Sequence, residues 1–216
     1  DASLKGATFE GSNLTSVNAQ RSDFSETDLR DANLTRARFD SSDFTNSNMK
    51  SSVLTQTGLR KANLTGVDVS YSEFDHTNIR EANLTEANLT GSIFTDVTGM
   101  HVKLDEADLT GVVLLRSRFV RTTFNNADLT GVDLSDNNLS GSKFEQAKHT
   151  DWTLWPSSTS PSSLGANQRE MRNPDLICDL SSISDCSGAD LNHTDISSAK
   201  LQNVRLVNTT LTGSGL

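Results

Sequence analysis

Residues 82–91 read Ala82-Asn83-Leu84-Thr85-Glu86-Ala87-Asn88-Leu89-Thr90-Gly91, which is one five-residue pattern written twice in succession. The pattern is a small residue, Asn or Asp, a large apolar residue and two polar residues. It continues in both directions: every fifth residue from Leu4 to Phe144 gives 29 positions, of which 15 are Leu and nine are Phe. All nine Phe of the 216-residue chain lie on this phase, so a five-residue repeat governs most of the sequence.

The spacing of the inward residues predicts short extended segments joined by corners. Residues two apart in an extended segment point to the same side, so the large apolar residue and the small residue two positions before it share an interior. The small position is Ala, Ser, Thr or Val in 28 of the 29 repeats. The next inward residue follows after three steps, which a straight strand cannot accommodate. An α-helix, with its period of 3.6, and a flat strand, with uninterrupted alternation, are both excluded.

Glycine supports the predicted corners. Several repeats carry Gly at the last corner position, where a positive φ is expected because Gly adopts it without steric cost: Gly6, Gly11, Gly66, Gly91, Gly111, Gly131 and Gly141. The residue between the two inward positions, most often Asn or Asp, is expected to face water.

Repeats of the form A(D/N)LXX, as in residues 82–91, resemble the pentapeptide-repeat proteins. The resemblance extends from Ala2 to about Gln146 and resumes from Ala189 to Leu216. It implies an all-β fold, a right-handed four-sided parallel β-helix in which four pentapeptides form one 20-residue coil. The chain would then have about seven coils, and one to two more after an insertion. Phenylalanines 20 residues apart would stack, in the pairs Phe24 with Phe44, Phe74 with Phe94 and Phe124 with Phe144.

We expect residues 1–216 to form one domain. The main repeat block is 1–146, and 147–188 is an insertion in which 167–172 can form one short helical turn. The repeats of 189–216 return in a new register and are expected to stack on the main block, because fewer than two coils are too few to be stable alone. Gly99 breaks the pattern at a large apolar position, where either Phe119 or Met100 fills the space or the chain bends.

Cys178 and Cys186 are the two cysteines, and both lie in the predicted insertion. A disulfide between them would stabilise this segment by about 2 to 3 kcal/mol and would require an oxidising compartment. The alternative is two free thiols in the cytosol. We favour the disulfide, and with it the periplasm or the thylakoid lumen, where the family resemblance also places many members; the cytoplasm is the alternative. No CxxC spacing is present, so we predict no metal site and no cofactor.

If four sides are right, residues 20 apart stack, and charges can be assigned to faces. The basic face, made of residues 17–21 and their 20-residue repeats, carries Arg21, Arg38, Arg60, Lys61, Arg80, Arg118 and Arg121. The acidic column on a neighbouring face consists of Asp28, Asp68, Asp108 and Asp128. These residues are either ordinary solvated charges or a field that steers an oppositely charged partner.

The sequence carries few signs of catalysis. The four His fall on separate repeats or in the insertion, and no Ser/His/Asp grouping, Gly-rich phosphate loop or HExxH motif occurs. We therefore predict no catalytic residues and no enzyme activity. The net charge of −9 argues against nucleic-acid binding. No run of 18 apolar residues exists, so no membrane span is expected.

Two functions follow from these observations. The first is a noncatalytic structural or protein-interaction rod with an unidentified protein partner. The second is implied by resemblance to the topoisomerase-protecting members of the family: a DNA mimic that interacts with or protects gyrase, with acidic columns in place of phosphates. The repeat begins in mid-pattern at Ala2, so end-to-end self-association of two rods is a further option.

Overall fold

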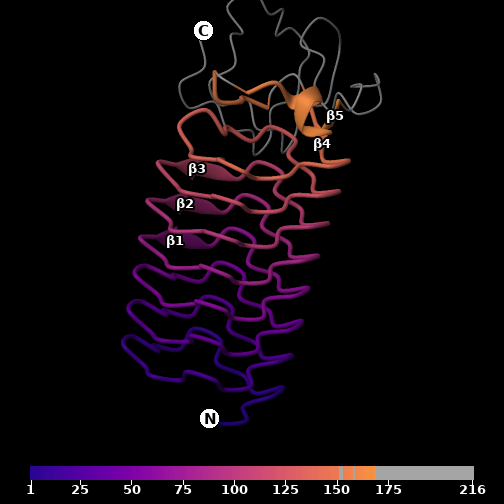
Figure 1. Cartoon of the computed structure of the whole chain (residues 1–216). Coiled ribbons are helices and arrows are strands. Elements are labelled where there is room, and N and C mark those ends of the chain that lie inside the picture. The colour runs from indigo at the N-terminus through magenta and orange to yellow at the C-terminus, as the bar shows by residue number, and fades with distance from the viewer. Residues whose placement is uncertain (151–152, 158, 169–216) are drawn as a thin grey trace, which may run out of the picture. The chain divides into compact units, whose positions relative to one another are not determined.

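The computed structural model describes residues 1–150, 153–157 and 159–168, which belong to one compact unit, Asp1–Arg169. The chain of this unit winds as a stack of coils in which a residue bridges, in parallel, to the residue 20 positions further on (Figure 1). Ser3 pairs with Asp23, for example, and Asn13 pairs with Asn33. The predicted parallel β-helix is therefore confirmed.

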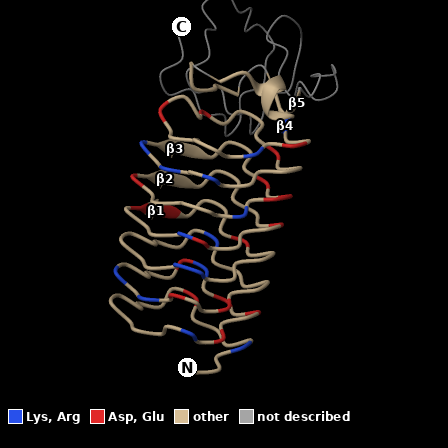
Figure 2. Ribbon diagram, in the orientation of Figure 1, with Lys and Arg blue, Asp and Glu red and all other residues tan. Residues whose placement is uncertain are grey.

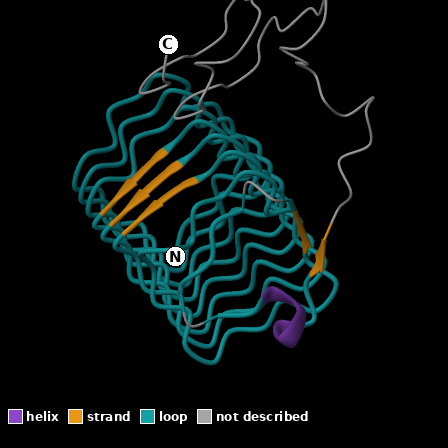
Figure 3. Ribbon diagram, turned by 90° about the horizontal axis from the view of Figure 1, so that it is seen from above, coloured by secondary structure: helices purple, strands orange, loops and turns teal. Residues whose placement is uncertain are grey.

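The regular strands are short, and they lie on two walls of the stack (Figure 3). A three-stranded parallel sheet has the order β1-β2-β3 and consists of β1 (Glu73–Asp75), β2 (Ile93–Thr95) and β3 (Val113–Leu115). A second parallel pair consists of β4 (Lys148–His149) and β5 (Asn167–Gln168). A 3-10 helix, η1 (Pro161–Leu164), lies outside the coils.

The interior of the coils is filled by the two predicted inward positions of each repeat. Leu34, Phe74 and Leu109 are 0%, 1% and 2% exposed, and the small residues between them are equally buried. The three predicted phenylalanine pairs are stacked, with ring centroids 5.0 Å (Phe24 with Phe44), 4.3 Å (Phe74 with Phe94) and 4.6 Å (Phe124 with Phe144) apart. The prediction of stacking at a 20-residue interval is thus confirmed.

Each corner is closed by the residue that the sequence pattern assigned only to water. The side-chain Oδ1 of the middle Asn or Asp accepts a hydrogen bond from the backbone N–H two residues later, as Asp23 does from Ser25 (2.9 Å) and Asn33 from Thr35 (3.0 Å). The last corner residue has a positive φ whether it is Gly91 (66°) or Glu86 (60°). The Asx hydrogen bond explains why Asn and Asp recur at the middle position.

The β1-β2-β3 sheet forms where this corner hydrogen bond is missing. Its middle residues are Glu73, Ile93 and Val113 in three consecutive coils, and none of them supplies an Asx acceptor. The two that are β-branched favour extended backbone. The extended segment therefore continues one residue further, to Asp75, Thr95 and Leu115, than in the coils with single bridges.

Buried hydroxyl groups link the coils at the small inward position. Ser72 is fully buried; its Oγ donates to the carbonyl of Met49 (2.9 Å) and accepts from the N–H of Ser52 (3.1 Å). Its own N–H donates to the Oγ of Ser92 (3.2 Å). Serine at this position is therefore a hydrogen-bonding element of the core and more than a small filler.

The coil continues beyond the predicted boundary at residue 146. Asp133 bridges to Leu154, 21 residues later, and Lys148 pairs with Asn167, 19 residues later. The helical turn predicted for 167–172 is wrong in its described part, because Asn167–Gln168 is strand β5. Backbone pairing, with the N–H of Asn167 donating to the carbonyl of Ala147 at 2.8 Å, replaces the local hydrogen bonds of a helix.

Gly99 is accommodated by one of the predicted neighbours. A Cβ at this position would lie 3.0 Å from Cδ1 of Phe119, so the phenyl ring occupies the space that a larger residue would fill. Cys178, Cys186 and the repeats of 189–216 lie outside the described residues, so the disulfide and the stacking of the second repeat block stay predictions.

Candidate interaction surfaces

The residues of the basic face lie together along one side of the stack, but several of them already have acidic partners. Arg60 and Lys61 both contact Glu81 at 3.5 Å, and Arg21 contacts Asp1 at 2.9 Å. Among the described residues, four of the predicted members form no ion pair: Arg38, Arg80, Arg118 and Arg121. Figure 2 shows acidic residues next to basic ones on several coils. The basic face is thus partly neutralised, and Asp1 is an opposing charge that the sequence grouping missed.

The acidic column has a structural task at each of its members. Oδ1 of Asp28, Asp68, Asp108 and Asp128 accepts the corner N–H of the residue two positions later. Asp28 also pairs with Arg30 at 2.6 Å, and the hydrogen bond from Arg30 lowers the pKa of this carboxyl below its ordinary value. Asn48 and Asn88 stand between the aspartates in the same column of bridges. The column therefore serves the corners and carries a sparse charge.

An apolar patch, which the sequence analysis did not single out, lies on the β1-β2-β3 sheet. It consists of Ile93, Val113 and Leu115, which are 43%, 43% and 41% exposed, and of Tyr71, which is 59% exposed. Ile93 pairs directly with Val113, so these two side chains are neighbours on the outer surface of the sheet. The signal in the sequence is that Ile93 and Val113 stand at the middle position, where most repeats have Asn or Asp.

The edge of the patch is shaped by the corner before each strand. Gly91 and Gly111 occupy this corner in the coils of Ile93 and Val113, so no side chain covers that edge. The ring of Tyr71 lies over Gly91, where a Cβ would come within 2.8 Å of the Tyr71 Cε1 atom. Lys50 approaches the same ring, with Nζ 5.4 Å from its centroid.

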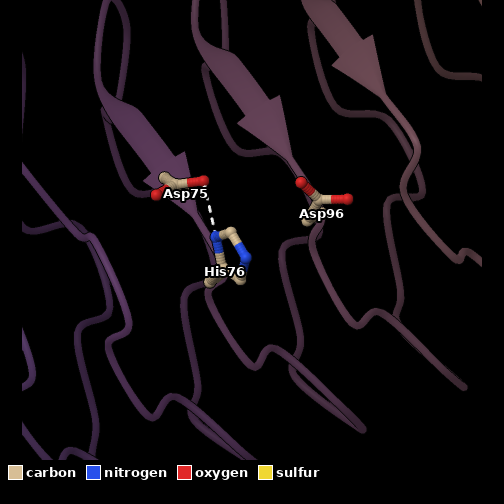
Figure 4. Close-up of side chains that lie close together, drawn as sticks. All are labelled: Asp75, His76 and Asp96. Atoms are coloured by element: carbon tan, nitrogen blue, oxygen red, sulfur yellow. Dashed lines mark hydrogen bonds and ion pairs between the residues drawn. The ribbon is translucent and has the colours of Figure 1, made fainter.

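The corner after these strands carries a charged cluster, which we call the charged corner: Asp75, His76, Asp96 and Arg116. Asp75 Oδ1 and His76 Nδ1 are 2.7 Å apart, and the carboxylate of Asp96 lies next to them on the following coil (Figure 4). Arg116 donates to both carboxylate oxygens of Asp96, at 3.1 and 2.7 Å. The hydrogen bond from Arg116, with its positive charge and that of His76, holds the pKa of Asp96 below the ordinary value.

Asp75, His76 and Asp96 are the described residues that come nearest to a metal-ligand set. One ligand atom from each lies within 4.8 Å of the others. A divalent cation would have to compete with Arg116 for Asp96 and with the hydrogen bond between Asp75 and His76. The cluster is thus described fully as an ion-pair network, and the sequence prediction of no metal site stays a prediction.

One broad, open hollow of about 730 Å³ lies at the end of the described coils. Its wall is made of the segment 136–142 and of residues that flank η1, including Pro156, Ser160 and Leu164. These are small polar and backbone groups, and the hollow brings together no His, Cys or Lys side chain. Within the described part of the chain, no helix is long and apolar enough to cross a bilayer.

Comparison with known proteins places these surfaces in a family context. The model of the family described as pentapeptide repeats matches the chain in eight copies, over residues 1–31, 20–56, 32–70, 59–96, 100–136, 116–148 and 184–213. A comparison with curated proteins found no match.

Three solved structures illustrate the structural likeness. HetL, a pentapeptide repeat protein involved in heterocyst differentiation regulation from the cyanobacterium Nostoc, is 22% identical over 100% of this chain and 83% of its own, with a TM-score of 0.43. Full-length QnrB1, a plasmid-mediated fluoroquinolone resistance protein, is 17% identical over 78% of this chain and 92% of its own, with a TM-score of 0.37. A pentapeptide repeat protein of the Arabidopsis thaliana thylakoid lumen is 23% identical over 61% of this chain and 67% of its own, with a TM-score of 0.24. None of these likenesses is close enough to transfer a function.

Proposed function

The chain belongs to the pentapeptide-repeat family, and from this premise we propose that it is a noncatalytic rod that binds a protein partner through its outer walls. We take the coil to be right-handed and four-sided, which the 20-residue bridge register and the corner at every fifth residue support. On this view residues 1–146 form about seven coils, and 189–216 add one to two more in the same domain.

The observation that carries the proposal is the apolar patch. The outward positions of the described coils are polar almost everywhere, yet Tyr71, Ile93, Val113 and Leu115 expose large apolar groups in adjacent coils. Contiguous exposed apolar groups rimmed by polar residues are typical of protein interaction sites. Because the coils are held by bridges on each wall, the patch is presented on a rigid surface that loses little conformational entropy on binding.

The acidic column does not favour the alternative function, DNA mimicry. Asp28, Asp68 and Asp108 follow each other at 40 residues, which is two coils or about 10 Å at the usual strand spacing. A DNA strand carries one charge about every 3.4 Å. A gyrase supercoiling assay separates the two functions, since strong inhibition at low protein concentration would support mimicry.

The compartment follows from the predicted disulfide between Cys178 and Cys186. We propose the periplasm or the thylakoid lumen, because a disulfide persists only in an oxidising environment. Thiol titration of the denatured, unreduced protein tests this: no reactive thiol is expected, and two reactive thiols would favour the cytoplasm.

Site-specific photocrosslinking in cells tests the interaction function. A photoreactive p-benzoylphenylalanine at position 113 is expected to form one discrete adduct with a partner protein. The same group at position 8 is the control, because Thr8 is also an exposed, bridged middle residue but lies away from the patch. Equal labelling at both positions, or no adduct at position 113, would contradict the proposal.

A further inference from the structure

We propose that the apolar patch is the docking site for a protein segment whose apolar side chains are bracketed by Lys or Arg residues. The inference rests on the proposed function and deepens it by naming the surface and the chemistry of the partner.

The apolar part of the site spans adjacent coils. Ile93 and Val113 are neighbours across the β2-β3 pairing, and Leu115 lies two residues beyond Val113 on the same outer face. Tyr71 stands at the open edge, held over Gly91. An aromatic ring beside aliphatic side chains on a fixed backbone is the composition typical of interface centres.

Acidic residues bracket the apolar column at both ends. Glu73 pairs with Ile93 on one side, and Asp133 bridges to Val113 on the other. Neither carboxylate forms an ion pair with any described residue, and both are exposed. They stand three coils apart, or about 14 Å at the usual strand spacing.

The basic residue nearest to this site does not neutralise it. Arg116, at the charged corner, spends its guanidinium on both oxygens of Asp96. Asp75, which pairs with Thr95 in the sheet, adds a further carboxylate beside Glu73. The patch thus has an apolar centre and an acidic rim, which complements a segment with an apolar centre and basic ends.

The same charges disfavour a second copy of the chain as the occupant. A symmetric dimer through the patch would place its two-fold axis between Ile93 and Val113. That axis would bring Glu73 of one copy opposite Asp133 of the other, at both ends of the contact. Like charges in register cost association free energy, so a basic partner fits the site and a self-pair does not.

Binding of a synthetic probe tests the inference. The probe is a fluorescent helical peptide with a Leu stripe between two pairs of Lys about nine residues apart, which spans about 14 Å at a rise of 1.5 Å per residue. A second probe has Glu in place of each Lys. Fluorescence anisotropy is expected to show salt-sensitive binding of the Lys probe and none of the Glu probe.

Three variants locate the binding. I93T/V113T/L115T removes the apolar centre and is expected to weaken the Lys probe about tenfold or more, and E73Q/D133N is expected to weaken it about tenfold and to flatten its salt dependence. D31N/E106Q changes the net charge equally on exposed corners away from the patch and is expected to change affinity less than twofold. Each variant is compared with the parent by circular dichroism and melting temperature.

The outcomes separate this inference from the proposed function. Equal binding to the parent and the apolar variant, or equal effects of E73Q/D133N and D31N/E106Q, would overturn the inference. So would a dimer in light scattering that I93T/V113T/L115T abolishes. If the adduct at position 113 persists in any of these cases, the proposed function stands alone; if neither adduct nor probe binding is seen, both fail.

Discussion

Asp23 shows what a single middle residue contributes to a corner. Its Oδ1 accepts from the hydroxyl of Ser25 at 2.7 Å and from the N–H of Ser25 at 2.9 Å. These two hydrogen bonds, the hydroxyl first, hold the pKa of the Asp23 carboxyl below its ordinary value. The stabilisation of a carboxyl with a lowered folded-state pKa is present above the unfolded-state pKa, near 3.9, and is lost as the pH falls through the folded-state pKa.

We expect Ser25→Ala to raise the pKa of Asp23 toward its ordinary value without restoring it fully, because the backbone N–H remains. A carboxyl carbon-13 NMR titration measures the change. Ser25→Thr is the matched control, since Thr45 makes the equivalent hydroxyl bond to Asp43 (2.5 Å). An unchanged titration in Ser25→Ala would show that the hydroxyl does not stabilise the carboxylate.

At the scale of the element, buried serines join one coil to the next. Ser72 donates to Met49 in one coil and accepts from Ser52, while Ser92 accepts from Ser72 in the following coil. Each hydroxyl is inside the core, so removing one leaves buried backbone groups with fewer partners, which costs more than the lost bond itself.

Ser72→Ala is expected to lower the free energy of unfolding by about 1 to 3 kcal/mol, as measured by chemical denaturation. Ser12→Ala serves as the control: Ser12 has the same place in the repeat but is partly exposed in the first coil, and its substitution is expected to change stability by less than about 0.5 kcal/mol. Equal losses in the two variants would contradict a special role for the buried ladder.

At the scale of the whole molecule, stability is a sum of contacts between neighbouring coils. Phe124 is fully buried and stacks on Phe144 with an interplanar angle of 4°. In a solenoid each coil contacts only its neighbours, so damage to one interface is expected to be felt nearby first.

Phe124→Ala is expected to cost about 3 to 5 kcal/mol, because it removes a large buried ring and leaves a cavity. Native-state hydrogen exchange should show the loss of protection centred on the coils of Phe124 and Phe144, with less effect near Leu34. Phe9→Ala, in the partly exposed first coil, is the control and should cost less. Uniform loss of protection along the chain would show a single cooperative unit.

The sequence alone determined the period, the inward residues, the corners and the stacked phenylalanine pairs. These follow from a local rule: each pentapeptide must bury the same two positions, and a fixed register repeats that requirement in every coil. Gly99 obeys the same rule, since Phe119 fills its place as one of the predicted alternatives.

The tertiary structure decided what happens outside the core. The apolar patch draws on three coils, the pairing of Arg21 with Asp1 joins two, and the corner bonds of Asn and Asp depend on side-chain orientation. Past residue 146 the register changes by one residue at Leu154 and at Asn167, so backbone pairing outweighed the local helical signal of 167–172. Outward residues are not constrained by the core, and their contacts depend on which neighbours the winding of the chain brings beside them.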